Sequence, residues 1–221
     1  MTISATRKAA VRAEIVEHAA RLFRLRGHAG TNIDDIMLAA GLTRGAFYAH
    51  FTSKDALFAE IVRMGHGLLP KLRAGKSAAV LDAYLDRENL GATGQGCALA
   101  ALAGDVARAP LAARLAYANV LHGVIAELAR ERKRALDADA TAVAILAVGA
   151  VTLARASGDT RLSDWLLRCA RRAAKALMKP KSRKPPSKQR ASTKRKRSTS
   201  RPKAAGVRPS RPAVRSRGGR A

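Results

Sequence analysis

The sequence has few cysteines, the residues that cross-link small domains or bind metals, and few sets of residues typical of catalytic centres. Only two of its 221 residues are cysteines, Cys97 and Cys169. Two thiols so far apart form neither a disulfide framework nor a zinc-binding pattern. No His, Cys, Asp or Glu cluster has metal-ligand spacing, and no Ser/His/Asp set or phosphate-binding glycine loop stands out. We therefore expect a protein that is not an enzyme and that carries no cofactor or metal.

Long hydrophobic runs are also missing. The longest uncharged apolar stretch, residues 140–154, has 15 residues, whereas a membrane-spanning helix needs roughly 20. The basic N-terminus is not followed by the apolar segment of a signal peptide. We expect a soluble protein with no membrane partner, located in the cytoplasm and associated with the nucleoid.

Aromatic residues make up only 4% of the chain, and no segment alternates apolar and polar residues with the period of a strand. The 48% of hydrophobic residues are mostly Ala and Leu, which favour helices. The sequence predicts an all-α fold of about nine helices. They are expected at residues 7–26, 31–40, 43–50, 53–76 (with a kink near Gly67 and Pro70), 78–90, 96–108, 111–136, 138–157 and 162–179.

Acidic residues are absent from the C-terminal part of the chain. The protein has 42 Lys and Arg against 16 Asp and Glu, a net charge of +26, and residues 180–221 hold 16 of the basic residues and no acidic ones. This Pro-rich tail has too little apolar surface to fold, so we expect it to be disordered. It is open whether the tail is a nonspecific DNA arm, a neutral solvated extension or a misassigned end of the reading frame. Charge of this sign and size favours nucleic acid as the partner.

One segment, residues 31–51, has the pattern of a helix-turn-helix. Gly41 suits the tight turn between two helices, and Phe47 and Phe51 give the second helix a buried face at a spacing of four. Thr31 is the expected N-cap of the first helix. The second helix, residues 43–50, is the one that such a motif places in the major groove of double-stranded DNA.

The outward residues of this second helix are small or polar. Arg44 can donate two hydrogen bonds to a guanine edge, and Gly45 and Ala46 let the helix backbone approach the bases. Hydroxyl, imidazole and ammonium donors suit phosphate oxygens. The residues expected to contact phosphates are Thr31, Thr43, Tyr48, His50 and Lys54.

The same stretch resembles the DNA-binding region of the TetR family of bacterial regulators. The resemblance covers roughly residues 15–62 and depends on Phe-Tyr-x-His-Phe at 47–51 followed by Ser-Lys-Asp-x-Leu at 53–57. It implies a DNA-binding domain at 1–53 and an effector-binding and dimerisation domain at 54–179. It also implies a homodimeric repressor that binds a palindromic operator and is released by a small molecule. The alternative is a sequence-tolerant architectural protein of the nucleoid type, whose binding the tail dominates.

Two further sets of residues follow from the resemblance. Helix 138–157 is rich in small residues and is followed by a stripe of larger ones. The residues expected in the dimer interface are Ala147, Ala150, Trp165 and Leu166. The alternative is that the two helices form a pair inside the chain. Cys97 precedes a helix, where a thiol can become a redox or electrophile sensor, although a lone cysteine is more commonly a buried hydrophobe. Cys97 joins Tyr117, His122 and His66 as candidates for an effector cavity. Each of the other three can equally be an ordinary buried polar group.

Overall fold

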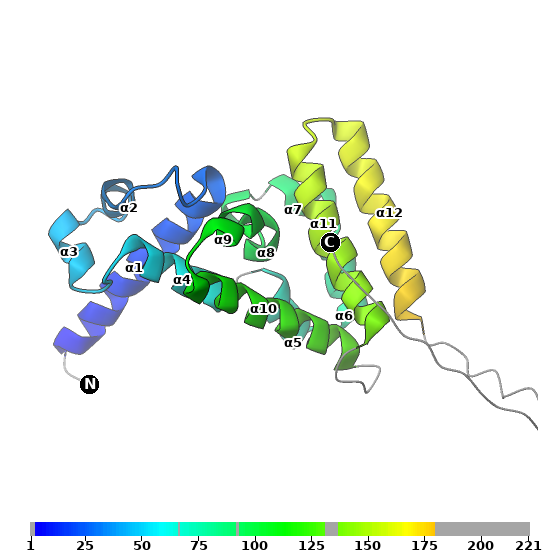
Figure 1. Cartoon of the computed structure of the whole chain (residues 1–221), viewed down its shortest axis with the longest axis horizontal. Coiled ribbons are helices and arrows are strands. Elements are labelled where there is room, and N and C mark those ends of the chain that lie inside the picture. The colour runs from blue at the N-terminus through cyan, green and yellow to red at the C-terminus, as the bar shows by residue number, and fades with distance from the viewer. Residues whose placement is uncertain (1–2, 66, 92, 131–136, 180–221) are drawn as a thin grey trace, which may run out of the picture. The chain divides into compact units, whose positions relative to one another are not determined.

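The computed structural model describes residues 3–65, 67–91, 93–130 and 137–179, and within them every regular element is a helix (Figure 1). The all-α fold class is therefore confirmed. The expected disorder of residues 180–221 falls outside the described residues. The helices expected at 138–157 and 162–179 are present as α11 (Ala138–Ala156) and α12 (Thr160–Met178).

The N-terminal helices pack around aromatic side chains. They are α1 (Ile3–Arg26), α2 (Ile33–Ala39), α3 (Arg44–Tyr48) and α4 (Lys54–Met64). Phe23 of α1, Phe47 of α3 and Phe58 of α4 are completely buried. The rings of Phe23 and Phe58 meet edge to face with centroids 5.2 Å apart, a favourable arrangement for an aromatic pair. These few large side chains fix how the helices of the candidate motif lie on α1 and α4.

Side-chain caps define where these helices begin. Asn32, and not Thr31 as predicted, is the N-cap of α2: its side chain accepts from the Asp35 N–H at 2.7 Å, and the Asp35 carboxylate accepts from the Asn32 N–H. Ser53 caps α4 as expected, accepting from the Ala56 N–H at 3.0 Å. The Thr31 hydroxyl makes a different contact and donates to the Gly27 carbonyl at 2.9 Å.

The remaining helices are shorter and more numerous than expected. They are α5 (Leu68–Ala74), α6 (Ser77–Tyr84), α7 (Arg87–Gly91), the 3-10 helix η1 (Thr93–Gln95), α8 (Ala98–Ala101), α9 (Ala103–Arg108) and α10 (Leu111–Arg130). The single helices expected at 53–76, 78–90 and 96–108 are each divided in two. The helix expected to reach residue 136 is described as far as Arg130, and its last six positions lie outside the described residues.

Backbone conformations away from the helical region produce these divisions. Gly65 ends α4 in the left-handed conformation at φ 60°, two residues before the predicted kink. Gly67 has φ 112°, and a Cβ there would lie 2.5 Å from the Cα of Cys97, so only glycine allows these two segments to approach so closely. Leu102 divides α8 from α9 at φ −111° and ψ 5° while its side chain is completely buried. Helix 53–76 is thus interrupted rather than kinked.

Two hydrophobic cores meet along α4 and α10, which pack against each other. One core combines α1 to α4 with Leu102 and Ala116 of the larger region, and the other is built mainly from α5, α6, α10, α11 and α12. The half-buried ring of Tyr117 packs against both. The described residues from 3 to 179 lie in one compact unit.

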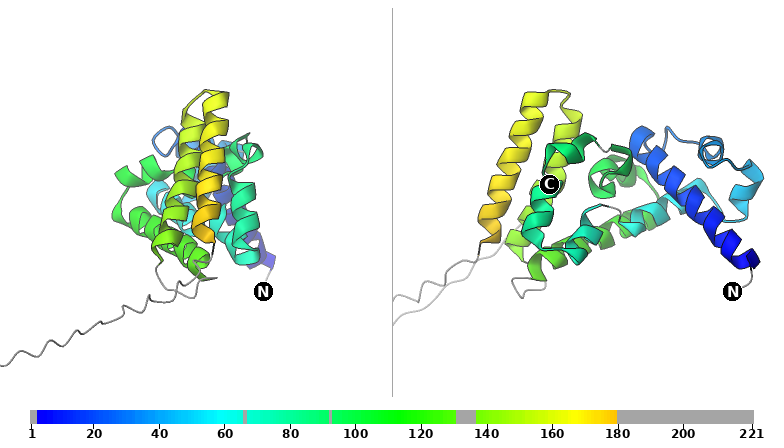
Figure 2. Two further views of the ribbon diagram at one scale, coloured as in Figure 1. Left: turned by 90° about the vertical axis from the view of Figure 1, so that its right-hand side faces the viewer. Right: turned by 180° about the vertical axis from the view of Figure 1, so that it is seen from behind.

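Helices α11 and α12 run side by side as an antiparallel pair (Figure 2). Among the described residues, α11 is the one helix long and apolar enough, by length and composition, to cross a membrane. Seven of its residues are nevertheless buried within the chain, including Val143 and Ala147. Burial along one side is typical of a helix that packs in a bundle.

Candidate nucleic-acid interface

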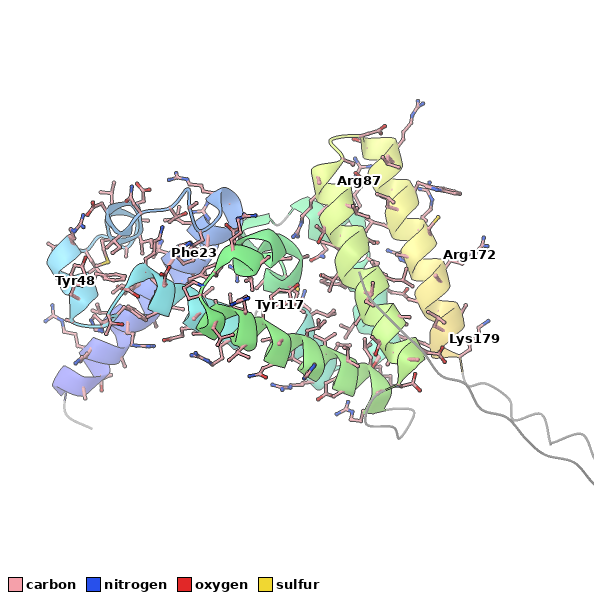
Figure 3. The ribbon with its side chains drawn as sticks, viewed as in Figure 1. Phe23, Tyr48, Arg87, Tyr117, Arg172 and Lys179 are labelled. Atoms are coloured by element: carbon pink, nitrogen blue, oxygen red, sulfur yellow. The ribbon has the colours of Figure 1, made fainter. Side chains whose placement is uncertain are left out.

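Helix α3 is held on α2 by a tight turn and presents its other side to solvent. Gly41 takes the left-handed conformation at φ 67°, and the Leu42 N–H then donates to the Met37 carbonyl at 2.8 Å. Phe47 points into the core, whereas Tyr48 is 56% exposed. Figure 3 shows Tyr48 on the outer side of α3 and Phe23 within the helices behind it. The geometry is that of a helix-turn-helix with a solvent-facing second helix.

The outer surface of α3 combines one cation with open backbone. Arg44 and Gly45 are exposed and Ala46 is half-buried. A Cβ at Gly45 would meet nothing closer than the Thr43 hydroxyl at 4.0 Å, so the backbone here is open to approach. The three residues predicted to face bases therefore lie together on or beside the exposed surface.

An acidic residue of α2 holds the Arg44 side chain in the free protein. Arg44 Nη1 lies 2.6 Å from Asp34 Oδ2, and both side chains are largely exposed. A pair in this setting contributes little to stability, because water screens it. Arg44 is thus available to an acceptor that replaces Asp34, such as a guanine edge.

His50 follows α3 with a half-buried imidazole. Its Nδ1 is buried and has no hydrogen-bond partner among the described residues. Burial lowers the pKa of His50, and the positive charges of Lys8 and Arg12 lower it further. The ring is therefore neutral near pH 7, so it can offer a phosphate one N–H donor without a charge.

Thr31 is buried and Lys54 is half-buried, which the sequence did not reveal. Thr31 is only 1% exposed, so its side chain has no surface to offer a phosphate. Lys54 Nζ donates to the carbonyls of His28 and Thr31, both at 2.8 Å. Lys54 therefore fastens α4 to the connection between α1 and α2. These acceptors lie 26 and 23 residues earlier in the chain, so only the fold brings them to the ammonium.

His28 connects the motif to the larger region. Its backbone N–H donates to Asp105 Oδ1 of α9 at 2.9 Å, and its ring packs 4.7 Å from that of Phe58. Burial lowers the pKa of the imidazole, and the charge of Lys54 lowers it further, while Asp55, 2.9 Å from Nε2, opposes both effects. Sequence reasoning missed this residue, since neither a motif nor its spacing marks it.

The candidates for an effector cavity that the structure describes differ in their surroundings. Cys97 is 2% exposed. The Tyr117 hydroxyl donates to the Leu99 carbonyl at 2.8 Å, which is an ordinary structural contact. His122 is exposed on α10, and His66 lies outside the described residues. A groove of about 600 Å³ is found elsewhere, between α1 and α4 and beside residues 94–95.

Of the four residues predicted for a dimer interface, two are inside the chain. Ala147 is completely buried and Ala150 nearly so, because both face the core between α11 and its neighbours. Trp165 is 59% exposed and Leu166 half-buried. The apolar side chains that α11 and α12 do expose are Ile145, Leu153, Leu162 and Trp165.

Comparison with known proteins agrees with this geometry. The family model of bacterial regulatory proteins, tetR family, matches residues 15–61, which run from α1 through the helix-turn-helix into α4. The chain is thus similar to the TetR family over its helix-turn-helix region. The transcriptional regulator AcrR of Shigella flexneri is 41% identical over 61 residues, 28% of each chain. The transcriptional repressor KstR2 of Rhodococcus jostii (strain RHA1) is 39% identical over 79 residues, 36% of this chain and 37% of the repressor.

The likeness to these curated relatives thus spans little more than a third of their length. Similarity of fold extends further: the structure of reduced NemR from E. coli superimposes with a TM-score of 0.61 at 24% identity, covering 76% of this chain and 96% of that one. The larger region therefore shares its fold with that structure, whereas the sequence likeness lies in the helix-turn-helix region.

Proposed function

We propose that this protein is a transcriptional regulator of the TetR family, acting in the cytoplasm as a homodimeric repressor that binds a palindromic operator and is released by a small molecule. The observation that carries the proposal is the pairing of a buried apolar side and an exposed polar side on α3. A helix built in this way can enter the major groove while α2 braces it. The names of the regulators related to residues 15–61 support the same reading.

In this proposal, Arg44 reads the operator after exchanging Asp34 for a guanine edge. Thr43, Tyr48 and His50 are exposed or half-exposed around it and would contact phosphates. Thr31 and Lys54 are left out of the contact set, since one is buried and the other is engaged by two carbonyls. The phosphate contacts set the register of the helix, and Arg44 and the open backbone at Gly45 set the sequence.

Selection of bound DNA from a random pool, at physiological salt, tests this function directly. The full chain should recover a palindrome whose half-sites lie about one helical turn, roughly 34–36 Å, apart. A chain ending at residue 179 should recover the same palindrome with less salt-sensitive background. Recovery of no motif by either chain would contradict the repressor, and loss of most binding on truncation would instead indicate the architectural alternative.

Three variants separate recognition of the base sequence from the phosphate contacts that position α3 on DNA. Arg44→Ala should relax preference at one base pair by about 1–3 kcal/mol. Tyr48→Phe should weaken binding to all sequences alike, because a phosphate contact carries no sequence information. Asp34→Asn should tighten binding, since it frees Arg44 and removes a negative charge near DNA. Arg114→Ala, which changes an exposed arginine of α10, serves as the control.

The proposed dimer uses the exposed sides of α11 and α12. Four large apolar side chains there are exposed in the described part of the chain, and burying them would favour association. Figure 1 shows this pair at the opposite end of the compact unit from α3. Two chains joined there would each keep a recognition helix free, as a palindromic site requires.

The single tryptophan of the chain reports on this interface. Sedimentation velocity should give a dimer, and dilution to monomer should shift the emission of Trp165 to longer wavelength as the ring enters water. Ile145→Asp should give a monomer, because it places a charge among the exposed apolar residues. Leu111→Asp, which alters an exposed leucine of α10, should leave the dimer intact. A monomeric wild-type protein at micromolar concentration would contradict the proposed dimer.

A further inference from the structure

Arg24 is a buried cation without a carboxylate partner among the described residues. It lies in the last turn of α1 and is 9% exposed. Its Nη1 donates to the Gly94 carbonyl at 3.2 Å, and its buried Nε has no hydrogen-bond partner. The end of a helix favours a cation, yet it supplies no acceptor to this N–H. A guanidinium in this position lacks the counter-charge that burial normally demands.

A second arginine makes the charge imbalance greater. Arg155 of α11 donates from Nη2 to the Asn89 carbonyl at 2.9 Å, and its Nε and Nη1 are buried without partners. Burial lowers the pKa of Arg24, and the nearby charge of Arg155 acts in the same direction. The two arginines thus place positive charge on the segment around η1. The acceptors that this segment gives Arg24 and Arg155 are the backbone carbonyls of Gly94 and Asn89.

The groove of about 600 Å³ between α1 and α4 reaches Arg24 from outside. Val16, Ala20 and Met64 give it an apolar wall. Arg12 and Glu60 also line it, but they neutralise each other, with Arg12 Nη1 2.6 Å from Glu60 Oε1. The remaining charged groups in the lining are Glu17 and Arg21, which lie exposed on α1 and balance in charge. The groove lining therefore carries one more positive charge than negative charges, and Arg24 is the residue that accounts for the excess.

We propose that the groove between α1 and α4 binds an amphipathic organic anion, with an apolar body against α1 and α4 and a carboxylate paired with Arg24. A volume of this size holds a small organic molecule. A carboxylate in the groove would accept a hydrogen bond from the Arg24 guanidinium and supply the missing charge.

Such a ligand would touch both helices that carry the recognition helix, together with residues 94–95 of the larger region. This regulatory consequence rests on the proposed function, whereas binding itself does not. An anion that fastens α1 to residues 94–95 would favour one relative placement of the motif and the larger region. By linkage, it would change DNA affinity to the extent that it prefers one of these placements.

Thermal unfolding of the full chain in the absence of DNA tests the binding. The probe is octanoate, used below its micelle-forming concentration, with octanamide and inorganic phosphate at matched ionic strength. Octanoate should raise Tm along a saturable curve, because it binds the folded state alone. Octanamide lacks the charge and phosphate lacks the apolar body, so both should give much smaller shifts. Equal shifts with octanamide or with phosphate would overturn the proposed ligand class.

Matched variants locate the site. Arg24→Met should raise the octanoate concentration at half-maximal shift by about tenfold or more, the loss expected for a charged hydrogen-bonded pair. Arg26→Met removes the same charge from the same turn of α1, but at an exposed residue outside the groove, and should bind like the wild type. Ala13→Glu adds a negative charge at an exposed position of the lining and should also weaken binding if Arg24→Met proves unstable.

An unchanged curve in both Arg24→Met and Ala13→Glu would overturn the site, since binding would then lie elsewhere, for example on the basic tail. No shift in the wild type would mean that Arg24 only fastens residues 94–95 to α1. Neither result bears on operator selection, so the failure of this proposal is distinguishable from failure of the proposed function.

Discussion

The N-terminal helices and the larger region are held together in different ways. All four phenylalanines of the chain lie within its first 58 residues, and each is buried in the core of α1 to α4. The core beneath α11 and α12 contains mainly alanine, leucine and valine, with alanines at 140, 144, 147 and 154. A few large side chains fix the first region by their shape, whereas close approach of helices with small side chains fixes the second. The two regions should therefore respond to opposite kinds of substitution.

Removing a large side chain should damage the N-terminal core most. Phe58→Ala deletes a completely buried ring that contacts Phe23 and His28, so we expect a loss of about 3–5 kcal/mol in the free energy of unfolding. Urea unfolding followed by far-UV circular dichroism measures it. Leu25→Ala, at a half-exposed leucine of α1, is the control and should change little. A loss under 1 kcal/mol for Phe58→Ala would refute the aromatic account of this core.

Adding a large side chain should damage the other core. Ala144 is completely buried on the side of α11 that packs inside the chain, so Ala144→Leu should cost about 1–3 kcal/mol through overpacking. The same unfolding measurement applies. Ala156→Leu, at an exposed position at the end of α11, should be nearly neutral. If the leucine were accommodated at 144 without loss, the helices would not be as closely packed as described.

A helix cap should have a smaller effect than either core substitution. Asn32→Ala removes the reciprocal cap of α2 and should cost about 0.5–2 kcal/mol. Lys76 occupies the N-cap of α6 without a side-chain cap, so Lys76→Ala should have little effect on stability. Chemical denaturation of the two variants side by side tests the contrast. Equal losses would show that the capping bond of Asn32 contributes nothing particular.

The smallest effect concerns the contact between the regions at His28. Its pKa lies below the ordinary 6.5, first because of burial and then because of Lys54, so below pH 6.5 the unfolded chain binds a proton more readily than the folded one. The contribution of His28 to the free energy of unfolding should therefore be at its maximum above pH 6.5. It should decrease as the pH falls from there towards the lowered pKa. Urea midpoints at pH 7.5 and 5.5 measure the decrease. The decrease between pH 7.5 and pH 5.5 should be smaller in His28→Gln than in the wild type, and the same as in the wild type in His122→Gln. An equal decrease in the wild type and both variants would exclude His28 as its source.

The sequence predicted the motif well because its signals are local. Gly41, Phe47, Phe51 and the Ser53 cap act within a few residues of one another, and the structure places each as expected. The Thr31 cap was wrong because Asn32, the next residue, competes for the same role and can form the reciprocal bond with Asp35. Local chemistry thus predicted the motif but could not decide between adjacent candidates for the cap.

The larger region was predicted less well because its helix ends depend on distant contacts. Gly65 ends α4 where a Cβ would lie 3.0 Å from Val120 Cγ1, and Gly67 lies against Cys97. Leu102 divides two helices although leucine favours helix, since its buried side chain belongs to the core of α1 to α4. Helices α5, α6, α8 and α9 also begin without a side-chain cap. No pattern confined to a short window could predict these ends, nor the carbonyl partners of Lys54 or the missing partner of Arg24.

The close approach of Gly67 to Cys97 also makes the labelling rate of the Cys97 thiol a measure of local opening. Cys97 is 2% exposed against this backbone, whereas Cys169, the other thiol of the chain, is exposed on α12. A thiol reagent should therefore modify Cys97 only at the rate at which the surrounding segments separate, whatever the rate at Cys169. Labelling of Cys97, followed by mass spectrometry of its peptide, measures how often the start of α8 separates from Gly67 at the start of α5, with no added probe and no substitution.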